Sequence, residues 1–188
     1  MLLEKIKDFN WISEPKNVEF IEKGLLITTK EQTDFWQNSS FNISKDDGHF
    51  FACVKDGDFS LTTKWSFEKI IESAQCGLMI KSDTKNWIKA GILPTTSKKA
   101  QIGVVVANNG TCDWSVYDLE KETKSVYFRI KRKGNNFIVC YSIDGEIYTQ
   151  IRLIHHLHIR DVIDVGAYAC SPKNESFDCV LEEIDIDF

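Results

Sequence analysis

The sequence predicts an all-β protein built as an antiparallel β-sandwich. Apolar residues recur with a period of two in short runs, which is the spacing of strands that bury one face. Turn signals separate these runs at intervals of about 8 to 15 residues, and apolar residues at helical spacing are nearly absent. With 188 residues, 43% of them hydrophobic, the chain can build one sizeable core, so we expect residues 1–188 to form a single domain.

The expected strands follow one another along the chain and are joined mainly by hairpins. In chain order they cover residues 24–29, 49–54, 59–67, 75–81, 86–93, 100–108, 113–118, 125–132, 136–143, 146–152, 164–169 and 177–187. Turn sequences separate several successive pairs, at 55–58 (Lys-Asp-Gly-Asp), 108–110 (Asn-Asn-Gly), 133–136 (Lys-Gly-Asn-Asn) and 144–145 (Asp-Gly). Gly, Asn and Asp tolerate the positive φ that tight hairpins require. Residues 1–10, 67–73 and 153–161 are expected to be helical or irregular.

The charge balance excludes several classes of partner. Twenty-three Lys and Arg against 28 Asp and Glu leave a net charge of -5, so no overall positive field attracts nucleic acid. The basic run 131–133 is interpreted as a solvated turn, because Gly134 and two asparagines follow it. No segment approaches the roughly 20 apolar residues that cross a membrane, so we expect a soluble protein with no membrane partner.

The six cysteines indicate a reducing compartment. They are scattered without the spacing of a zinc site, and most lie inside or beside strand-like runs, which predicts buried free thiols. The N-terminal residues show no secretory signal, so we expect a cytoplasmic protein.

The middle strands have two different faces. In residues 75–81, Cys76 and Leu78 lie on a core face and Gln75 and Met79 lie opposite. The same alternation turns Trp87 and Lys89 outward in residues 86–92, and Arg129 outward in residues 126–131. If these strands are neighbours, one outward face collects the side chains Gln75, Met79, Trp87, Lys89 and Arg129.

This mixture of aromatic, amide and cationic side chains predicts a ligand groove. Aromatic rings stack on the apolar faces of sugars, and convergent polar groups bind hydroxyls or an acidic group. We expect Trp87 to be the stacking platform and Trp36 and Trp114 to be aromatic residues at the rim. Gln75, Lys89 and Arg129 would then be the polar set that gives specificity. The alternative is that a loop covers Trp87 and that Lys89 merely stacks on it.

A series of short motifs runs along the chain. They are 33–36 (Thr-Asp-Phe-Trp), 46–50 (Asp-Asp-Gly-His-Phe), 57–59 (Gly-Asp-Phe), 75–80 (Gln-Cys-Gly-Leu-Met-Ile), 86–91 (Asn-Trp-Ile-Lys-Ala-Gly), 112–115 (Cys-Asp-Trp-Ser), 141–145 (Tyr-Ser-Ile-Asp-Gly) and 166–172 (Gly-Ala-Tyr-Ala-Cys-Ser-Pro). In this order they resemble the family of unknown-function domains named for a yeast regulator of enolase, from about Trp11 to the C-terminus.

The resemblance implies a concanavalin A-like jelly roll of the lectin/glucanase superfamily, with two curved antiparallel sheets and a concave face. It implies no established catalytic activity. The family's usual Asp-Gln-Ala-Gly segment reads Ala-Gln-Cys-Gly at residues 74–77, so an acidic neighbour of the groove is missing.

The sequence also contains candidates for one catalytic site and two metal sites. Glu183, Asp185 and Asp187 alternate like the carboxylates of a retaining glycosidase, but they stand at the chain end, where they fit the wet face of a terminal strand. The histidines at 155, 156 and 158 are expected at the surface or in loops, because they lack the partners of a metal site. Calcium binding through the aspartates at 46, 47, 56 and 58 is a weaker hypothesis, and no cofactor is expected.

The sequence therefore favours a non-catalytic domain that binds a carbohydrate or a sugar-acid-like small molecule on its concave face. One alternative is a regulatory protein–protein interaction domain that acts on a metabolic enzyme such as enolase. A second alternative is a glycosidase or lyase. Homodimerisation through an edge strand or the outward sheet face also stays open.

Overall fold

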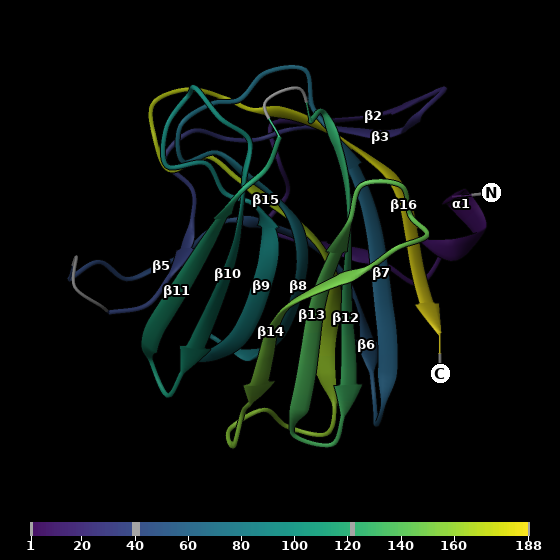
Figure 1. Cartoon of the computed structure of the whole chain (residues 1–188), viewed down its shortest axis with the longest axis vertical. Helices are drawn as coiled ribbons and strands as arrows, with labels where there is room; N and C mark the ends of the chain where they lie inside the picture. The colour runs from purple at the N-terminus through teal and green to yellow at the C-terminus, as the bar shows by residue number, and fades with distance from the viewer. Residues whose placement is uncertain (1, 39–41, 121–122, 188) are drawn as a thin grey trace.

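The computed structural model describes residues 2–38, 42–120 and 123–187, and it confirms an all-β antiparallel sandwich (Figure 1). Its elements are α1 (Leu2–Lys5), β1 (Asn10–Ile12), β2 (Asn17–Ile21), β3 (Gly24–Thr28), β4 (Phe35–Trp36), β5 (Lys45–Asp46), β6 (His49–Lys55), β7 (Phe59–Ser66), β8 (Gln75–Asp83), β9 (Asn86–Ile92), β10 (Gln101–Asn108), β11 (Thr111–Asp118), β12 (Ser125–Lys133), β13 (Asn136–Ser142), β14 (Thr149–His155), β15 (Ile163–Cys170) and β16 (Asp178–Asp187). No helix among these residues has the length and apolarity needed to cross a membrane.

Two seven-stranded sheets form the sandwich. The first, sheet A, has the strand order β1-β6-β15-β8-β9-β10-β11, and the second, sheet B, has the order β14-β13-β12-β7-β16-β3-β2. The predicted turns at 108–110, 133–136 and 144–145 join paired strands, and Asn109, Gly110, Gly134 and Gly145 have positive φ there. The turn at 55–58 is not a hairpin, because it leads from β6 in sheet A to β7 in sheet B, although Gly57 also has positive φ. The short strands β1, β2, β4 and β5 were not predicted, because each is too short or too exposed to show a periodic pattern.

The side chains that were predicted to face inward, from apolar residues at every second position, lie in the core between the two sheets. Cys76 and Leu78 of β8 lie in it, with Ile88 and Ala90 of β9 beside them. Sheet B contributes Phe128, which is fully buried. The hydrophobic alternation therefore predicted correctly which side of each of these strands faces inward.

Sheet A is covered on its other face as well. A second cluster of buried side chains lies there, and the segment that carries β4 and β5 provides its cover. Phe35 of β4 packs edge-on against Phe50, Trp87 and Tyr168, with ring centroids 6.5, 6.5 and 6.3 Å away. In Figure 1 the β5 segment lies beside sheet A, away from β12, β13 and β14. Part of the face that was expected to be an open groove is thus an additional packed layer.

Candidate functional site

Three of the predicted ligand residues are buried beneath this cover. Met79, Trp87 and Lys89 are each 0% exposed. The expectation that Trp87 is an open stacking platform is therefore wrong, because Phe35 lies against its ring and no ligand can reach that surface. The structure agrees with the alternative, in which a loop covers Trp87 and Lys89 stacks on it. Lys89 Nζ lies 5.6 Å from the ring centroid of Trp87.

Lys89 is held by an acidic side chain and a backbone oxygen. Its ammonium lies 3.1 Å from Asp34 Oδ1 and donates a hydrogen bond to the carbonyl of Phe35 at 2.7 Å. A buried ammonium needs such partners, because burial without them costs several kcal/mol. We conclude that Lys89 fastens the β4 segment onto sheet A, so the role predicted for it as a ligand contact is corrected to a structural one.

Arg129 lies elsewhere in the molecule. It belongs to β12, which is in sheet B, whereas β8 and β9 are in sheet A. Its guanidinium stacks on Tyr148 at 3.5 Å from the ring centroid, and its Nε donates to Thr62 Oγ1 at 3.0 Å. The expected grouping with Gln75 and Trp87 is wrong, because a period of two assigns a residue to a face but does not say which sheet the strand joins.

The other three predicted residues meet at a cavity of about 280 Å³, which we call the tryptophan pocket. Trp36, Gln75 and Trp114 all line it. Among the residues that the structure describes, the lining consists of Asp34, Trp36, Ile43, Ser73, Gln75, Leu93, Pro94, Thr95, Trp114 and Pro172. The pocket lies at the margin of the β4 cover, where the outer face of sheet A is reached from solvent.

The two tryptophans form an aromatic corner. Their ring centroids are 6.1 Å apart and their planes are perpendicular. Trp114 is 36% exposed, so a ligand can reach its ring. Gly103 on the neighbouring strand makes room for this ring, because a Cβ there would lie 3.0 Å from Trp114 Nε1 and 2.9 Å from Leu93 Cβ. The corner therefore places two perpendicular aromatic rings at the pocket.

Asp34 provides the acidic group of the pocket. Its Oδ1 accepts hydrogen bonds from the backbone N–H of Phe35 at 2.8 Å and from Gln75 Nε2 at 3.3 Å, in addition to the ion pair with Lys89. The thiol of Cys170 lies 3.6 Å from the same oxygen. These contacts between described residues all reach Oδ1.

A buried polar network supports this carboxylate from below. Tyr168 donates from its hydroxyl to Gln75 Oε1 at 3.5 Å, which orients the amide toward Asp34. Burial raises the pKa of Tyr168 well above its usual value, so its hydroxyl stays protonated. Burial, reinforced by the charge of Asp34, likewise raises the pKa of the Cys170 thiol. On its protein side the carboxylate is thus contacted by the Lys89 ammonium and by two neutral groups, the Gln75 amide and the Cys170 thiol.

Asp34 was not among the predicted ligand residues, since an Asp that precedes an aromatic residue in a turn commonly just caps a backbone N–H. Its bond to the Phe35 N–H is such a cap, but the ion pair with Lys89 gives it a second role. The contact partners are 55 residues apart in the chain, which no local pattern reveals. Ser73 was also missed; its N–H bonds the Pro94 carbonyl at 2.8 Å and ties together two loops at the pocket.

The acidic strand considered for catalysis lies away from the tryptophan pocket, in sheet B. Glu183 accepts a hydrogen bond from Tyr127 at 3.4 Å and lies 3.7 Å from Lys64 Nζ. Asp185 forms an ion pair with Lys5 at 2.6 Å. Neither carboxylate lines the tryptophan pocket.

The groups considered for metal binding have other partners. Within the described ranges, His, Cys, Asp and Glu nowhere gather in threes as a metal ion would require. Asp46 pairs with Lys81 at 2.5 Å, and Asp58 accepts from the Gly134 N–H at 2.7 Å. His156 was expected at the surface or in a loop; it lies in the loop after β14, where it is fully buried and its Nε2 bonds the Ala107 carbonyl at 2.7 Å. The prediction of buried free thiols is confirmed for all six cysteines.

Comparison with known proteins gives consistent results for sequence and structure. Residues 11–188 match the family described as "Protein of unknown function (DUF1349)". The chain is 27% identical, over 176 residues, to "Regulation of enolase protein 1" of Saccharomyces cerevisiae, and the match covers 92% of this chain and 86% of that protein.

Two solved structures have the same fold over nearly their whole length. A functionally unknown protein from Saccharomyces cerevisiae superposes with a TM-score of 0.89 at 24% identity, covering 97% of each chain. The carbohydrate-binding module CBM66 of Bacillus subtilis superposes with a TM-score of 0.64 at 11% identity, covering 96% of each chain. At these identities the likeness concerns the fold.

Proposed function

We propose a ligand-binding role for this chain, which belongs to the DUF1349 family of proteins of unknown function. The ligand is one ring of a neutral carbohydrate, and it occupies the tryptophan pocket. The observation that carries the proposal is the aromatic corner of Trp36 and Trp114 beside the carboxylate of Asp34. Sugar recognition uses this combination, because the C–H faces of the ring stack on an aromatic plane while a carboxylate accepts hydrogen bonds from the hydroxyls.

The size of the pocket suits a single sugar ring. Its volume of about 280 Å³ is near the lower end of the range for small-molecule sites, roughly 300 Å³ upward. Leu93 and Pro94 supply apolar surface at its wall, and Gln75 supplies an amide. A longer glycan would have to extend past the exposed edge of Trp114.

The charge of the pocket favours a neutral sugar over a sugar acid. Asp34 is the only ionisable side chain among the residues known to line it. Its partner Lys89 is fully buried beneath the pocket and is already paired. A ligand carboxylate would therefore lie near Asp34 without a cation of its own, and like charges at this range repel.

Binding can be measured by titration calorimetry with D-glucose, D-galactose, D-mannose, D-xylose, D-fructose and D-glucuronate. We expect at least one neutral sugar to bind and D-glucuronate to bind more weakly than D-glucose or D-galactose. Trp114→Ala should weaken binding about tenfold, the equivalent of about 1.4 kcal/mol, because it removes one stacking surface. Trp114→Phe, which keeps an aromatic plane, is the matched variant and should retain most of the affinity.

A second candidate function rests on the relative named "Regulation of enolase protein 1". We propose that a metabolic enzyme such as enolase is a partner of this chain in addition to the small ligand. Purified enolase should then bind the chain directly in calorimetry, and the added sugar should change that affinity. Absence of binding between the two purified proteins would contradict this candidate and leave the sugar proposal intact.

We further propose that the protein works in the cytosol as a single domain. Six buried, unpaired cysteines support a reducing compartment, where thiols stay free. The family match to nearly the whole chain supports one domain.

A further inference from the structure

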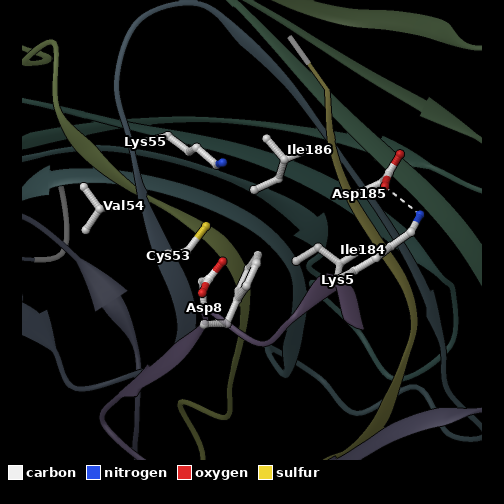
Figure 2. Close-up of a pocket in the computed structure, with 9 residues that line it drawn as sticks. Lys5, Asp8, Cys53, Val54, Lys55, Ile184, Asp185 and Ile186 are labelled. Atoms are coloured by element: carbon white, nitrogen blue, oxygen red, sulfur yellow. Dashed lines mark hydrogen bonds and ion pairs between the residues drawn. The ribbon is translucent and has the colours of Figure 1, made fainter. Parts of the chain in front are cut away.

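Two larger cavities differ in whether their lysines are already engaged. One, of about 500 Å³, lies between β6 and β16 beneath the N-terminal segment (Figure 2). Its Lys5 forms an ion pair with Asp185 at 2.6 Å, and its Lys55 has an interaction of its own. The other cavity, of about 490 Å³, lies on the outer face of sheet B at the end of the β12–β13 hairpin, and we call it the lysine cavity. It shares no lining residue with the tryptophan pocket.

The lysine cavity contains the basic run 131–133, the last three residues of β12. The expectation of a solvated turn there is corrected, because the run belongs to a strand and its side chains alternate across the sheet. Arg132 is 4% exposed, donates to three backbone carbonyls at 2.8 to 3.0 Å and lies 3.8 Å from the carboxylate of Asp161. Lys131 and Lys133 are exposed on the outer face, and neither has a hydrogen bond or an ion pair with another residue that the structure describes.

The strand register shows which side chains flank Lys131. Ser60 of β7 lies directly opposite it on one side and Ile138 of β13 on the other. Leu153 of β14 lies opposite Ile138, so these four residues form one row across the outer face, and all four line the cavity. Directly opposite residues have Cβ atoms about 5 Å apart. Lys133 lies two positions further along β12, about 7 Å from Lys131 on the same face.

Positive charge predominates at the lysine cavity. The two lysines add their charges to that of the paired Arg132, and among the described residues of the lining Asp58 is the one carboxylate. Asp58 Oδ1 accepts a hydrogen bond from the backbone N–H of Gly134 at 2.7 Å, so the hairpin turn engages it. Asp187 of β16 lies opposite Ser60 and does not line the cavity. In a chain with a net charge of -5, this cavity is therefore a local site of attraction for an anion.

We propose that the lysine cavity binds a phosphate monoester. Its phosphate oxygens accept hydrogen bonds from the ammonium groups of Lys131 and Lys133 and from the hydroxyl of Ser60. A phosphate monoester carries about two negative charges and three acceptor oxygens at neutral pH, so it can contact both ammonium groups, whereas a sulfate ester brings one charge.

The apolar end of the row accommodates the organic group of the ester. Ile138 is half-buried, and Leu153 is 64% exposed, so the side chain of Leu153 can contact a ligand. Covering this surface gains about 25 cal/mol for each Å² removed from water, which free phosphate cannot do. The volume of the cavity is within the range of small-molecule sites, roughly 300–1,000 Å³.

Three anions test this proposal on the full chain by titration calorimetry. They are phenyl phosphate, phenyl sulfate, which has the same ring and one negative charge, and inorganic phosphate, which has no organic group. We expect phenyl phosphate to bind saturably and about tenfold more tightly than either of the others. Equal affinity for phenyl sulfate would refute recognition of a doubly charged group, and equal affinity for inorganic phosphate would refute recognition of an ester. Absence of saturable binding of phenyl phosphate would overturn the proposal as a whole.

Charge variants locate the site on β12. Lys131→Gln and Lys133→Gln should each weaken the binding of phenyl phosphate about tenfold. The matched control is Lys124→Gln, which makes the same change of charge at an exposed lysine just before the other end of β12, and it should leave the affinity unchanged. Thermal unfolding checks that each variant is folded. An equal loss in Lys124→Gln would show a general effect of net charge and would overturn the assigned site, as would unchanged affinity in both cavity variants.

Two further variants separate the parts of the proposal. Leu153→Ser should weaken the binding of phenyl phosphate and leave that of inorganic phosphate unchanged; an unchanged affinity for phenyl phosphate would contradict the place assigned to the organic group. Trp114→Ala should leave the binding of phenyl phosphate unchanged, so the sugar site and the phosphate site can succeed or fail separately. A loss of phenyl phosphate binding in Trp114→Ala would place this ligand in the tryptophan pocket and overturn the proposal.

Discussion

The ion pair between Asp34 and Lys89 predicts a large and non-additive response to mutation. Asp34→Asn removes the negative charge and leaves a fully buried ammonium whose close acceptors, the Phe35 carbonyl at 2.7 Å and the introduced amide oxygen, are both neutral. Removing one partner of a buried ion pair costs about 3–5 kcal/mol. Because the Asp34 side chain is 17% exposed, we expect the lower end, about 3 kcal/mol of unfolding free energy. For a chain of this size that lowers Tm by roughly 6–12 °C.

The matched change is Lys89→Met, which keeps the hydrocarbon stem against Trp87 and Tyr168 but removes the charge. Asp34 then keeps hydrogen bonds from Gln75 and the Phe35 N–H, so the loss should be about 1 kcal/mol. The double variant should be no less stable than Lys89→Met alone, which gives a coupling energy of about 3 kcal/mol. Urea unfolding of the four proteins measures this cycle. Additive effects, or a cost below about 1 kcal/mol for Asp34→Asn, would refute the structural role of Lys89.

Three further outcomes are expected. Trp87→Ala should lower the unfolding free energy by about 3–5 kcal/mol in urea unfolding, because this fully buried ring supports Phe35, whereas Trp114→Ala should cost far less. Arg129→Met should leave sugar affinity in calorimetry unchanged, because Arg129 lies in sheet B, and a loss of affinity would contradict the assigned site. Burial lowers the pKa of His49 and His156 below 6.5, so the unfolded chain takes up protons before the folded chain does as the pH falls. The contribution of these histidines to the unfolding free energy should therefore be complete above pH 6.5 and decrease below it, until the pH reaches their pKa values in the folded chain. Tm values measured between about pH 7.5 and pH 5.5 check this expectation. If Tm changed with pH equally in the double variant His49→Gln/His156→Gln, the expectation would be contradicted.

The sequence predicted the strands and their inward faces because a period of two follows directly from the pleat of a strand. It assigned Leu78 and Ile88 to the core and placed Met79 and Trp87 on the opposite face, all in agreement with the structure. It could not predict that this face is covered, because the covering segment contains two strands of two residues each and therefore has no measurable period. Phe35 gave no local sign that it packs on Trp87, a residue far along the chain.

The sequence predicted the candidate site only in part, because it shows residue types but not which strands become neighbours. Trp36, Gln75 and Trp114 were identified by residue type, and the structure brings them to one pocket. Arg129 was grouped with them because alternation says nothing about which strands are neighbours, and the order of the sheets depends on contacts between distant residues. Asp34 was undervalued because its role comes from a partner in another strand.

The central claim is that a neutral sugar contacts the exposed tryptophan corner and leaves the buried face of sheet A undisturbed. The chain contains five tryptophans, whose indole N–H signals can be followed separately by ¹H–¹⁵N NMR during titration with the neutral sugar that binds best in calorimetry. The signals of Trp36 and Trp114 should shift together and saturate, while those of Trp65 and Trp87, both fully buried, stay in place. A saturable shift at Trp87 with Trp114 unmoved would contradict the claim.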